Sequence, residues 1–249
     1  RAFCYFDLGR TFGKAPLILK AQNLEEDLLV APSSFAEIVE FVKDECDLYA
    51  DNLPLTYPEE EAGHATKGAF LALKSRALLY LASPLNSEDD ARKWDDAAVA
   101  AQAVMDLHVY ELYKVGETPY RSMEFDKTAA NKEVIFERRF SFPEAPHNIH
   151  MMWSLDAEDA GSWNGLYPTQ NLVDAYEMKD GTPFDWNNST HVANMYYDAA
   201  NKQTRDPRLY LNVLTNGSMW QKQKVETFEG GKNKVLDGST KTGYYLRKY

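Results

Sequence analysis

Aromatic and hydrogen-bonding side chains gather in the segment 141–168, which has no regular periodicity. Four of the five tryptophans of the chain lie after residue 150, at Trp153, Trp163, Trp186 and Trp220. A sugar ring has flat patches of C–H bonds on its faces and hydroxyls at its rim, so its site needs aromatic platforms beside amide or carboxylate groups. The segment supplies both kinds of group, with platforms at Trp153, Trp163 and Tyr167 and polar partners at His147, Asn148, Asp156 and Asn164.

Two other interpretations of these residues stay open. Most tryptophans of globular proteins pack in a core or a lid, and we expect this of Trp94, which lies on a helical stripe. A glycosidase needs two carboxylates about 5–9.5 Å apart, one with a raised pKa. Asp156, Glu158 and Asp159 could form such a pair, but a solvated acidic loop explains them more simply.

Metal and nucleophile motifs are weak in this sequence. The five histidines are scattered, at His64, His108, His147, His150 and His191. His147 and His150 are three residues apart, but no HExxH motif or carboxylate register favours zinc. The segment 185–189 lacks the glycine and the last glutamate of a calcium loop. No GxSxG, GxGxxG or P-loop motif occurs, so we expect no metal and no cofactor.

Charge and composition exclude further classes. The chain has 249 residues, with 27 Lys and Arg against 38 Asp and Glu, which gives a net charge of −11. An acidic surface repels phosphate backbones, so no nucleic-acid partner is expected. The longest stretch without a charged side chain is 160–173, whereas crossing a bilayer takes about 20 apolar residues. We therefore expect no membrane-spanning segment.

Two cysteines, Cys4 and Cys46, are too few for a disulfide framework or a four-cysteine zinc site. We expect both to be small buried side chains on helices, and a single Cys4–Cys46 disulfide is the alternative.

The sequence predicts a helix at 2–8 and three amphipathic helices after it in the first half. The segment 32–53 has an apolar stripe, and Ser34 with Glu37 forms a capping box at its start. The segment 66–83 is the strongest helix. A further helix, capped by Ser87 and Asp90, would complete a hairpin whose alanines allow close packing. Its expected inner face consists of Trp94, Ala97, Ala98, Ala101, Val104 and Met105.

The sequence of the second half predicts loops with short strands and one short helix. Strands are expected at 133–140, at 209–214 and in the run 243–249, the last one without a partner, and a short helix at 171–178. The acidic run 59–61 is interpreted as a solvated linker, and 205–208 as a proline turn braced by an Asp–Arg pair. The fold class expected is mainly α (α+β), a tetratricopeptide-like helical scaffold at 1–115 followed by a loop-rich lobe with short strands at 116–249.

Several motifs occur in a fixed order along the chain. They are FGKAPLI at 12–18, GHATKGA at 63–69, WDDAA at 94–98, NKEVIF at 131–136, PTQNLVDAYE at 168–177 and RDPRL at 205–209. In this order the motifs resemble those of the SusD/RagB family of nutrient-binding outer-membrane lipoproteins. His64 departs from the family pattern, which usually has arginine there.

The resemblance implies one continuous SusD-like fold, truncated at both ends, with the signal peptide and lipid-modified cysteine before residue 1. It implies a surface-exposed outer-membrane protein that binds an oligosaccharide without catalysis and delivers it to a SusC-like TonB-dependent transporter. The segment 141–168 corresponds to a ligand-facing loop of the family. A protein–protein adaptor that uses the helices alone is the main alternative, and a glycoside hydrolase is the second.

Overall fold

A computed structural model describes most of the chain. The residues described are 1–25, 27–87, 90–126, 128, 131–141, 143–147, 155, 165–220, 222–235 and 240–247. They belong to two compact units, which we call the helical unit (Arg1–Arg139) and the loop-rich unit (Phe140–Tyr249). The fold is mainly α-helical with a few short strands, as the sequence predicts. The separate regions predicted at 1–115 and 116–249 stay a prediction.

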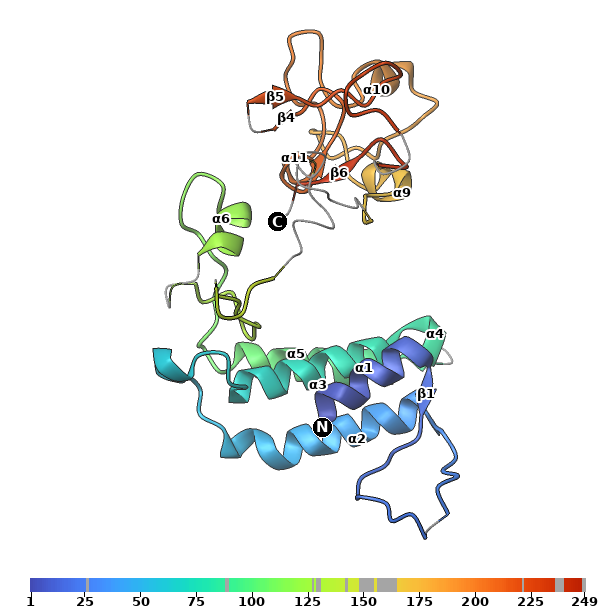
Figure 1. The fold of residues 1–249 in the computed structure, drawn as a ribbon, viewed down its shortest axis with the longest axis vertical. Coiled ribbons are helices and arrows are strands. Elements are labelled where there is room, and N and C mark those ends of the chain that lie inside the picture. The colour runs from blue at the N-terminus through green and yellow to red at the C-terminus, as the bar shows by residue number, and fades with distance from the viewer. Residues whose placement is uncertain are drawn as a thin grey trace. The chain divides into compact units, whose positions relative to one another are not determined.

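The helical unit is a bundle of four longer helices with short elements between them (Figure 1). Its elements are α1 (Ala2–Phe12), β1 (Lys14–Ala15), β2 (Ser33–Ser34), α2 (Phe35–Tyr49), the 3-10 turns η1 (Ala50–Asn52) and η2 (Glu59–Glu61), α3 (Lys67–Ala82), α4 (Pro84–Ser87), α5 (Arg92–Met105) and α6 (Pro119–Phe125). Helix α3 packs mainly against α5, and α2 packs against α1 and α3. No helix in the described ranges is both long enough and apolar enough to cross a bilayer.

Helix α2 begins as predicted. The Glu37 backbone N–H donates to Ser34 Oγ over 3.3 Å, and Glu37 Oε2 accepts from the Ser34 backbone N–H over 2.7 Å. Its buried face carries Ile38, Val42 and Cys46, which are fully covered. The capping box therefore fixes where the helix starts, and the apolar stripe fixes which side faces the core.

The hairpin of α3 and α5 is confirmed, but two details differ. Buried Ala77 and Ala82 on α3 and Ala97 and Ala100 on α5 allow the helices to approach closely, as the alanine pattern predicts. The expected cap is only partly right: the Asp90 carboxylate accepts from the Arg92 backbone N–H, the first of α5, over 3.1 Å, whereas Ser87 ends α4.

The inner face predicted for α5 is also partly wrong. Trp94 is 46% exposed and Met105 is 66% exposed, while Ala97 and Ala100 take the buried positions. Three residues turn a helix by about 300°, so Trp94 and Ala100 lie on opposite edges of a face centred on Ala97. The narrow alanine seam leaves Trp94 outside the core.

The cysteines differ from each other. Cys46 is buried as predicted, whereas Cys4 is exposed on α1, so the expectation of a second buried thiol is wrong. Both are free, so the alternative of a Cys4–Cys46 disulfide is also excluded.

The strand predicted at 133–140 does not form in the described residues. The Tyr113 backbone N–H donates to the Glu133 carboxylate over 2.8 Å, so a side chain takes the place of a neighbouring strand. The segment has apolar residues at strand spacing but no backbone ladder beside it.

The loop-rich unit has short helices and two-stranded sheets. Its elements are α9 (Gln170–Asp174), α10 (Ser189–Ala193), α11 (Pro207–Asn212), β3 (Val213–Leu214), β4 (Met219–Trp220), β5 (Gln223–Lys224) and β6 (Tyr245–Leu246). Strand β3 pairs antiparallel with β6, and β4 pairs with β5. The predicted helix at 171–178 is confirmed as the shorter α9. The strand predicted in 243–249 is confirmed as β6, but it has a partner, contrary to expectation.

The strand predicted at 209–214 is mostly helix. The Asp206 carboxylate accepts from the Arg208 backbone N–H over 2.8 Å, and Pro207 occupies the first helical position of α11. Proline there is already fixed at a helical φ, so the cap outweighs the β preference of the apolar run that follows. The ion pair of Asp206 with Arg208 confirms the predicted bracing of the turn.

Candidate functional site

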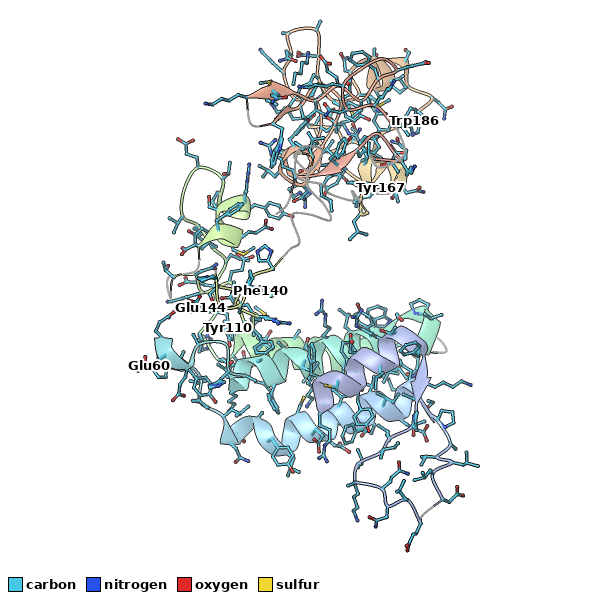
Figure 2. The ribbon with its side chains drawn as sticks, viewed as in Figure 1. Glu60, Tyr110, Phe140, Glu144, Tyr167 and Trp186 are labelled. Carbon is cyan, nitrogen blue, oxygen red and sulfur yellow. The ribbon has the colours of Figure 1, made fainter. Side chains whose placement is uncertain are left out.

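The structure places two of the seven predicted site residues. His147 and Tyr167 are described, whereas Asn148, Trp153, Asp156, Trp163 and Asn164 lie outside the described residues. His147 contacts Phe140 edge-on, with ring centroids 5.3 Å apart. Tyr167 is half-buried and precedes α9, as Figure 2 shows.

Helix α9 positions Tyr167. The Pro168 carbonyl accepts from Thr242 Oγ1 over 2.6 Å, which ties the chain beside Tyr167 to the 240–247 segment. Thr169 Oγ1 caps the helix by accepting from the Leu172 backbone N–H over 3.3 Å. Tyr167 therefore projects from a backbone that is fixed at the adjoining residues.

A chain of hydrogen bonds anchors α9 to the core of its unit. The Tyr244 hydroxyl donates to Gln170 Oε1 over 2.6 Å, and the Tyr196 and Tyr244 hydroxyls lie 2.6 Å apart. Because Tyr244 uses its proton on Gln170, Tyr196 must donate to Tyr244. Burial raises the pKa of Tyr196, so this phenol stays neutral and keeps its proton for the chain. On the helix itself, Val173 is fully buried against the same core.

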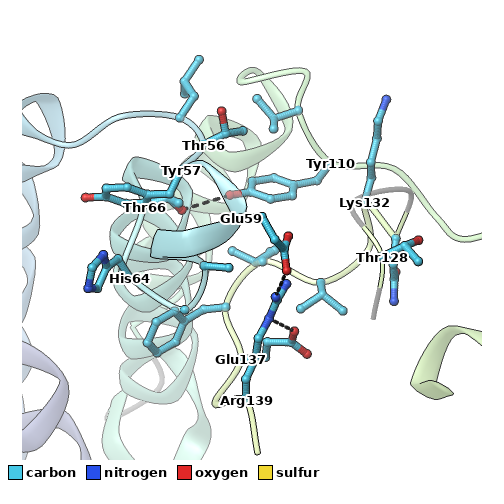
Figure 3. A pocket seen from close by; sticks show the side chains of 18 of the residues that line it. Thr56, Tyr57, Glu59, His64, Thr66, Tyr110, Thr128, Lys132, Glu137 and Arg139 are labelled. Atoms are coloured by element: carbon cyan, nitrogen blue, oxygen red, sulfur yellow. Dashed lines mark hydrogen bonds and ion pairs between the residues drawn. The ribbon is translucent and has the colours of Figure 1, made fainter. Parts of the chain in front are cut away.

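The helical unit contains a separate cavity of about 250 Å³ (Figure 3). Its walls come from the loop before α3, from Val109 and Tyr110, from Asp126 and Thr128, and from the segment 131–139. Tyr57 and His64 meet edge-on at its mouth, with ring centroids 5.4 Å apart. The hollow thus combines aromatic and polar side chains.

Tyr110 forms one wall of this cavity because α3 carries a glycine beside it. A Cβ on Gly68 would lie 2.0 Å from the Tyr110 hydroxyl, so the ring occupies the space where any other residue would place a side chain. The Tyr110 hydroxyl also lies 3.3 Å from Thr66 Oγ1, the cap of α3. The start of α3 and the cavity wall are therefore built together.

The charged groups of the cavity are paired. Arg139 forms ion pairs with Glu59, which lies on η2, and with Glu137 (Figure 3). The hydrogen bond to Glu59 is the main reason that the pKa of Arg139 is raised. The run 59–61 is thus a 3-10 turn with an ion pair as well as a solvated surface.

Asp126, a further carboxyl in the cavity wall, is ionised. Hydrogen bonds from Thr128, then from Tyr113, lower its pKa, so this carboxyl is no proton donor at neutral pH.

Carboxyl groups elsewhere show the same direction. Wherever a carboxyl pKa shifts among the described residues it is lowered, mainly by hydrogen bonding, at Glu37, Asp51, Asp90, Glu111, Asp126, Asp180 and Asp206. A glycosidase acid needs the opposite shift. Within the described residues no cluster of His, Cys, Asp and Glu could hold a metal ion.

Sequence reasoning missed the cavity of the helical unit. Its lining residues Tyr57, Tyr110 and Arg139 are far apart in sequence, and His64 stands out only as a departure from the family pattern. The helical Gly68 was the available signal, since a glycine inside a strong helix indicates a close neighbour.

Comparison with known proteins decides the family. The model of the SusD family matches residues 122–249, just over half of the chain. The chain belongs to the SusD family. This SusD-family chain matches no curated protein.

Solved structures agree along the entire chain. A SusD-like protein from Bacteroides fragilis is 27% identical with a TM-score of 0.75, and the match covers 100% of this chain and 49% of that one. A SusD-like carbohydrate-binding protein from the same species is 26% identical with a TM-score of 0.76, and the match covers 100% of this chain and 46% of that one. A SusD superfamily protein from Bacteroides vulgatus, 20% identical, shares the fold with a TM-score of 0.58, over 100% of this chain and 45% of its own. The chain thus spans about half the length of each of these structures.

Proposed function

We propose that this SusD-family protein binds an oligosaccharide at the bacterial cell surface and delivers it, without catalysis, to a SusC-like TonB-dependent transporter. One observation carries the proposal: the chain is similar, over its full length, to a protein described as carbohydrate-binding. Similarity at 26% identity supports the general class of ligand and leaves the particular glycan open.

The proposed site is the segment before α9. Trp153, Trp163 and Tyr167 would stack on sugar rings, and His147, Asn148, Asp156 and Asn164 would bond to hydroxyls. The support is the fixed position of Tyr167, whose neighbours Pro168 and Thr169 are both held by hydrogen bonds. A rigid platform loses little conformational entropy when a flexible glycan binds.

The absence of catalysis is proposed on electrostatic grounds. The carboxyl pKa shifts resolved in the described residues are all downward, which suits hydrogen-bond acceptors and not general acids. The glycosidase alternative therefore finds no support in the part of the chain that the structure describes.

The partner and the location are proposed from family membership. A SusD-family protein at the outer membrane would be held by a lipid anchor, and its tetratricopeptide-like helices would contact the transporter. The exposed apolar side chains of the helical unit, such as Phe3 and Val99, are consistent with a protein contact.

A polysaccharide panel tests the function. Affinity electrophoresis with amylopectin, xylan, mixed-linkage β-glucan, galactomannan and pectic galactan should show retardation by at least one of them, and calorimetry with oligosaccharides from that polymer should give a dissociation constant. No retardation by any member would favour the adaptor. Release of reducing ends over time would favour the hydrolase.

Variants then test the segment. The double variant Trp153→Ala, Trp163→Ala should lose binding while its circular dichroism spectrum is unchanged. Trp94→Ala, which removes a half-exposed indole from the helical unit, is the control and should bind normally. Unchanged affinity in the double variant would reject the assignment of the segment 141–168.

A further inference from the structure

Trp186 lies outside the segment 141–168 and outside the core of the loop-rich unit. Its side chain is 50% exposed at the surface of the loop-rich unit (Figure 2). Trp220, in contrast, is partly buried and packs against the cluster of Leu214, Val225 and Tyr245. Half of the Trp186 indole therefore contributes nothing to packing within the described residues.

The first brace of this indole is a hydrogen bond at its edge. Trp186 Nε1–H donates to Asp174 Oδ2 over 2.9 Å. The other oxygen of Asp174 accepts from Gln170 Nε2 over 2.7 Å, and Gln170 is the residue that Tyr244 anchors to the core. The indole is thus bonded to α9, the helix that also positions Tyr167.

The second brace is aromatic. Phe184 meets Trp186 edge-on, with ring centroids 5.2 Å apart, and its own ring stacks on His191 at 6.0 Å. The buried Arg205 guanidinium lies 4.2 Å from the centroid of the Phe184 ring. Because Phe184 contacts both Arg205 and His191, it gives Trp186 an ordered aromatic support.

The rim of the indole is polar. Asp185 and Asn187 flank Trp186 in the chain and both are exposed. The Asn187 backbone N–H and Nδ2 donate to Asp185 Oδ1 over 2.8 and 3.1 Å, which fixes this turn next to the ring. The other side-chain oxygens of these two residues can accept hydrogen bonds from a ligand.

We propose that Trp186 is a sugar-stacking platform, an additional subsite for a pyranose ring outside the segment 141–168. The indole N–H is already satisfied, so the exposed face offers apolar contact only, which matches the C–H face of a sugar ring. Asp185 and Asn187 supply acceptors for the equatorial hydroxyls. The rigid mounting lowers the entropic cost of stacking.

This inference rests on the proposed function and deepens it. An oligosaccharide that contacts both Tyr167 and Trp186 would be bound by two aromatic rings, one just before α9 and one hydrogen-bonded to that helix. The subsite adds affinity for longer chains, because a monosaccharide occupies only one platform.

Calorimetry tests the subsite with an oligosaccharide of at least four sugar units from the retarding polymer. Trp186→Ala should weaken binding by roughly ten- to a hundred-fold, the loss expected when the exposed half of an indole no longer covers a ligand. Trp94→Ala is the matched control, a similarly exposed indole that should leave the affinity unchanged. Equal affinity in Trp186→Ala and the unaltered protein overturns the proposal.

A second measurement needs no alanine variant. The indole ¹H–¹⁵N signal of Trp186, assigned by its loss in Trp186→Phe, should shift when the same oligosaccharide is added, while the Trp94 signal stays in place. An unshifted Trp186 signal at saturation overturns the subsite. If binding is lost in the double variant of Trp153 and Trp163 but kept in Trp186→Ala, the proposed function stands and only this inference falls. If no panel member binds the unaltered protein, both fall.

Discussion

The helical unit and the loop-rich unit are held together by different chemistry. In the helical unit the buried residues are mainly aliphatic side chains on helix faces, such as Ile38, Val39 and Val42. Among the described residues the loop-rich unit buries more polar groups, such as Arg205, Thr215 and Thr240, than the helical unit, where they are Ser87 and Asn131. The difference follows from backbone hydrogen bonding, because helices satisfy their own backbone groups and loops do not.

Arg205 shows how the loop-rich unit meets this need. Its guanidinium donates to the backbone carbonyls of Val173, Tyr176, Met195 and Glu177. These carbonyls belong to the end of α9, to the chain just after it and to the segment after α10, so one side chain takes the place of a missing sheet. Apolar helix faces therefore stabilise the helical unit, whereas the loop-rich unit combines its apolar clusters with a buried hydrogen-bond donor.

Removing that donor should have the largest effect. Arg205→Met keeps much of the volume but leaves four carbonyls without their donor, so we expect the loop-rich unit to lose about 4 kcal/mol of unfolding free energy. Four of the five tryptophans lie in this unit, so the fluorescence midpoint in urea should fall. The circular dichroism midpoint, which reports mainly on the helical unit, should move little.

Arg208→Met is the control for this experiment. Arg208 is exposed and pairs with Asp206 in the same RDPRL motif, and exposed ion pairs contribute about 0–1 kcal/mol. If Arg205→Met and Arg208→Met shift the fluorescence midpoint equally, the buried guanidinium is not what holds the loops.

A substitution at a close contact tests the packing of the helical unit, again through the stability of a variant. Gly68→Ala places a Cβ 2.0 Å from the Tyr110 hydroxyl, so the ring must leave its position. Alanine is about 1 kcal/mol better than glycine inside a helix, but overpacking costs about 1–3 kcal/mol. We expect a net loss of about 1 kcal/mol, seen as a lower circular dichroism midpoint.

Relief of the clash is the check on that explanation. In the double variant Gly68→Ala, Tyr110→Ala the Cβ has room, so it should be more stable than Tyr110→Ala alone. If Gly68→Ala costs the same with and without Tyr110, the glycine is needed for something other than the ring.

The sequence predicted the helical unit well because its signals are local. The Ser34 and Glu37 box and the stripe of Ile38, Val42 and Cys46 each lie within one helix, where spacing alone decides the structure. The errors in this unit are the exposed side chains of Trp94 and Cys4 and the missing strand at the described residues 133–140, and each of them depends on which neighbouring element lies beside the residue.

The loop-rich unit was harder to predict because its contacts join distant segments. The sequence predicts Arg205 only as part of a proline turn, and no residue near it in the sequence indicates that its side chain is buried against α9. Asp174, which accepts the hydrogen bond from the Trp186 indole, likewise lies twelve residues away in sequence. The family motifs predict the segment 141–168 as the candidate site, which stays a prediction, and they give no indication of the cavity around Tyr110.

The two cysteines give the last and smallest test, confined to the helical unit. Burial raises the pKa of the Cys46 thiol from 9.0 to about 11, whereas Cys4 is exposed. The folded unit thus favours the neutral thiol, so this contribution to stability is complete below pH 9 and is lost as the pH rises toward 11.

Two measurements follow from the position of these thiols. At pH 8, iodoacetamide should label Cys4 in the folded protein and Cys46 only in urea. Between pH 8 and pH 10.5 the circular dichroism midpoint should fall further in the unaltered protein than in Cys46→Ala, since the variant has no thiol to ionise. The same pH dependence in both proteins would show that Cys46 is open to solvent on the folded bundle, and labelling of Cys46 at pH 8 without urea would show it directly.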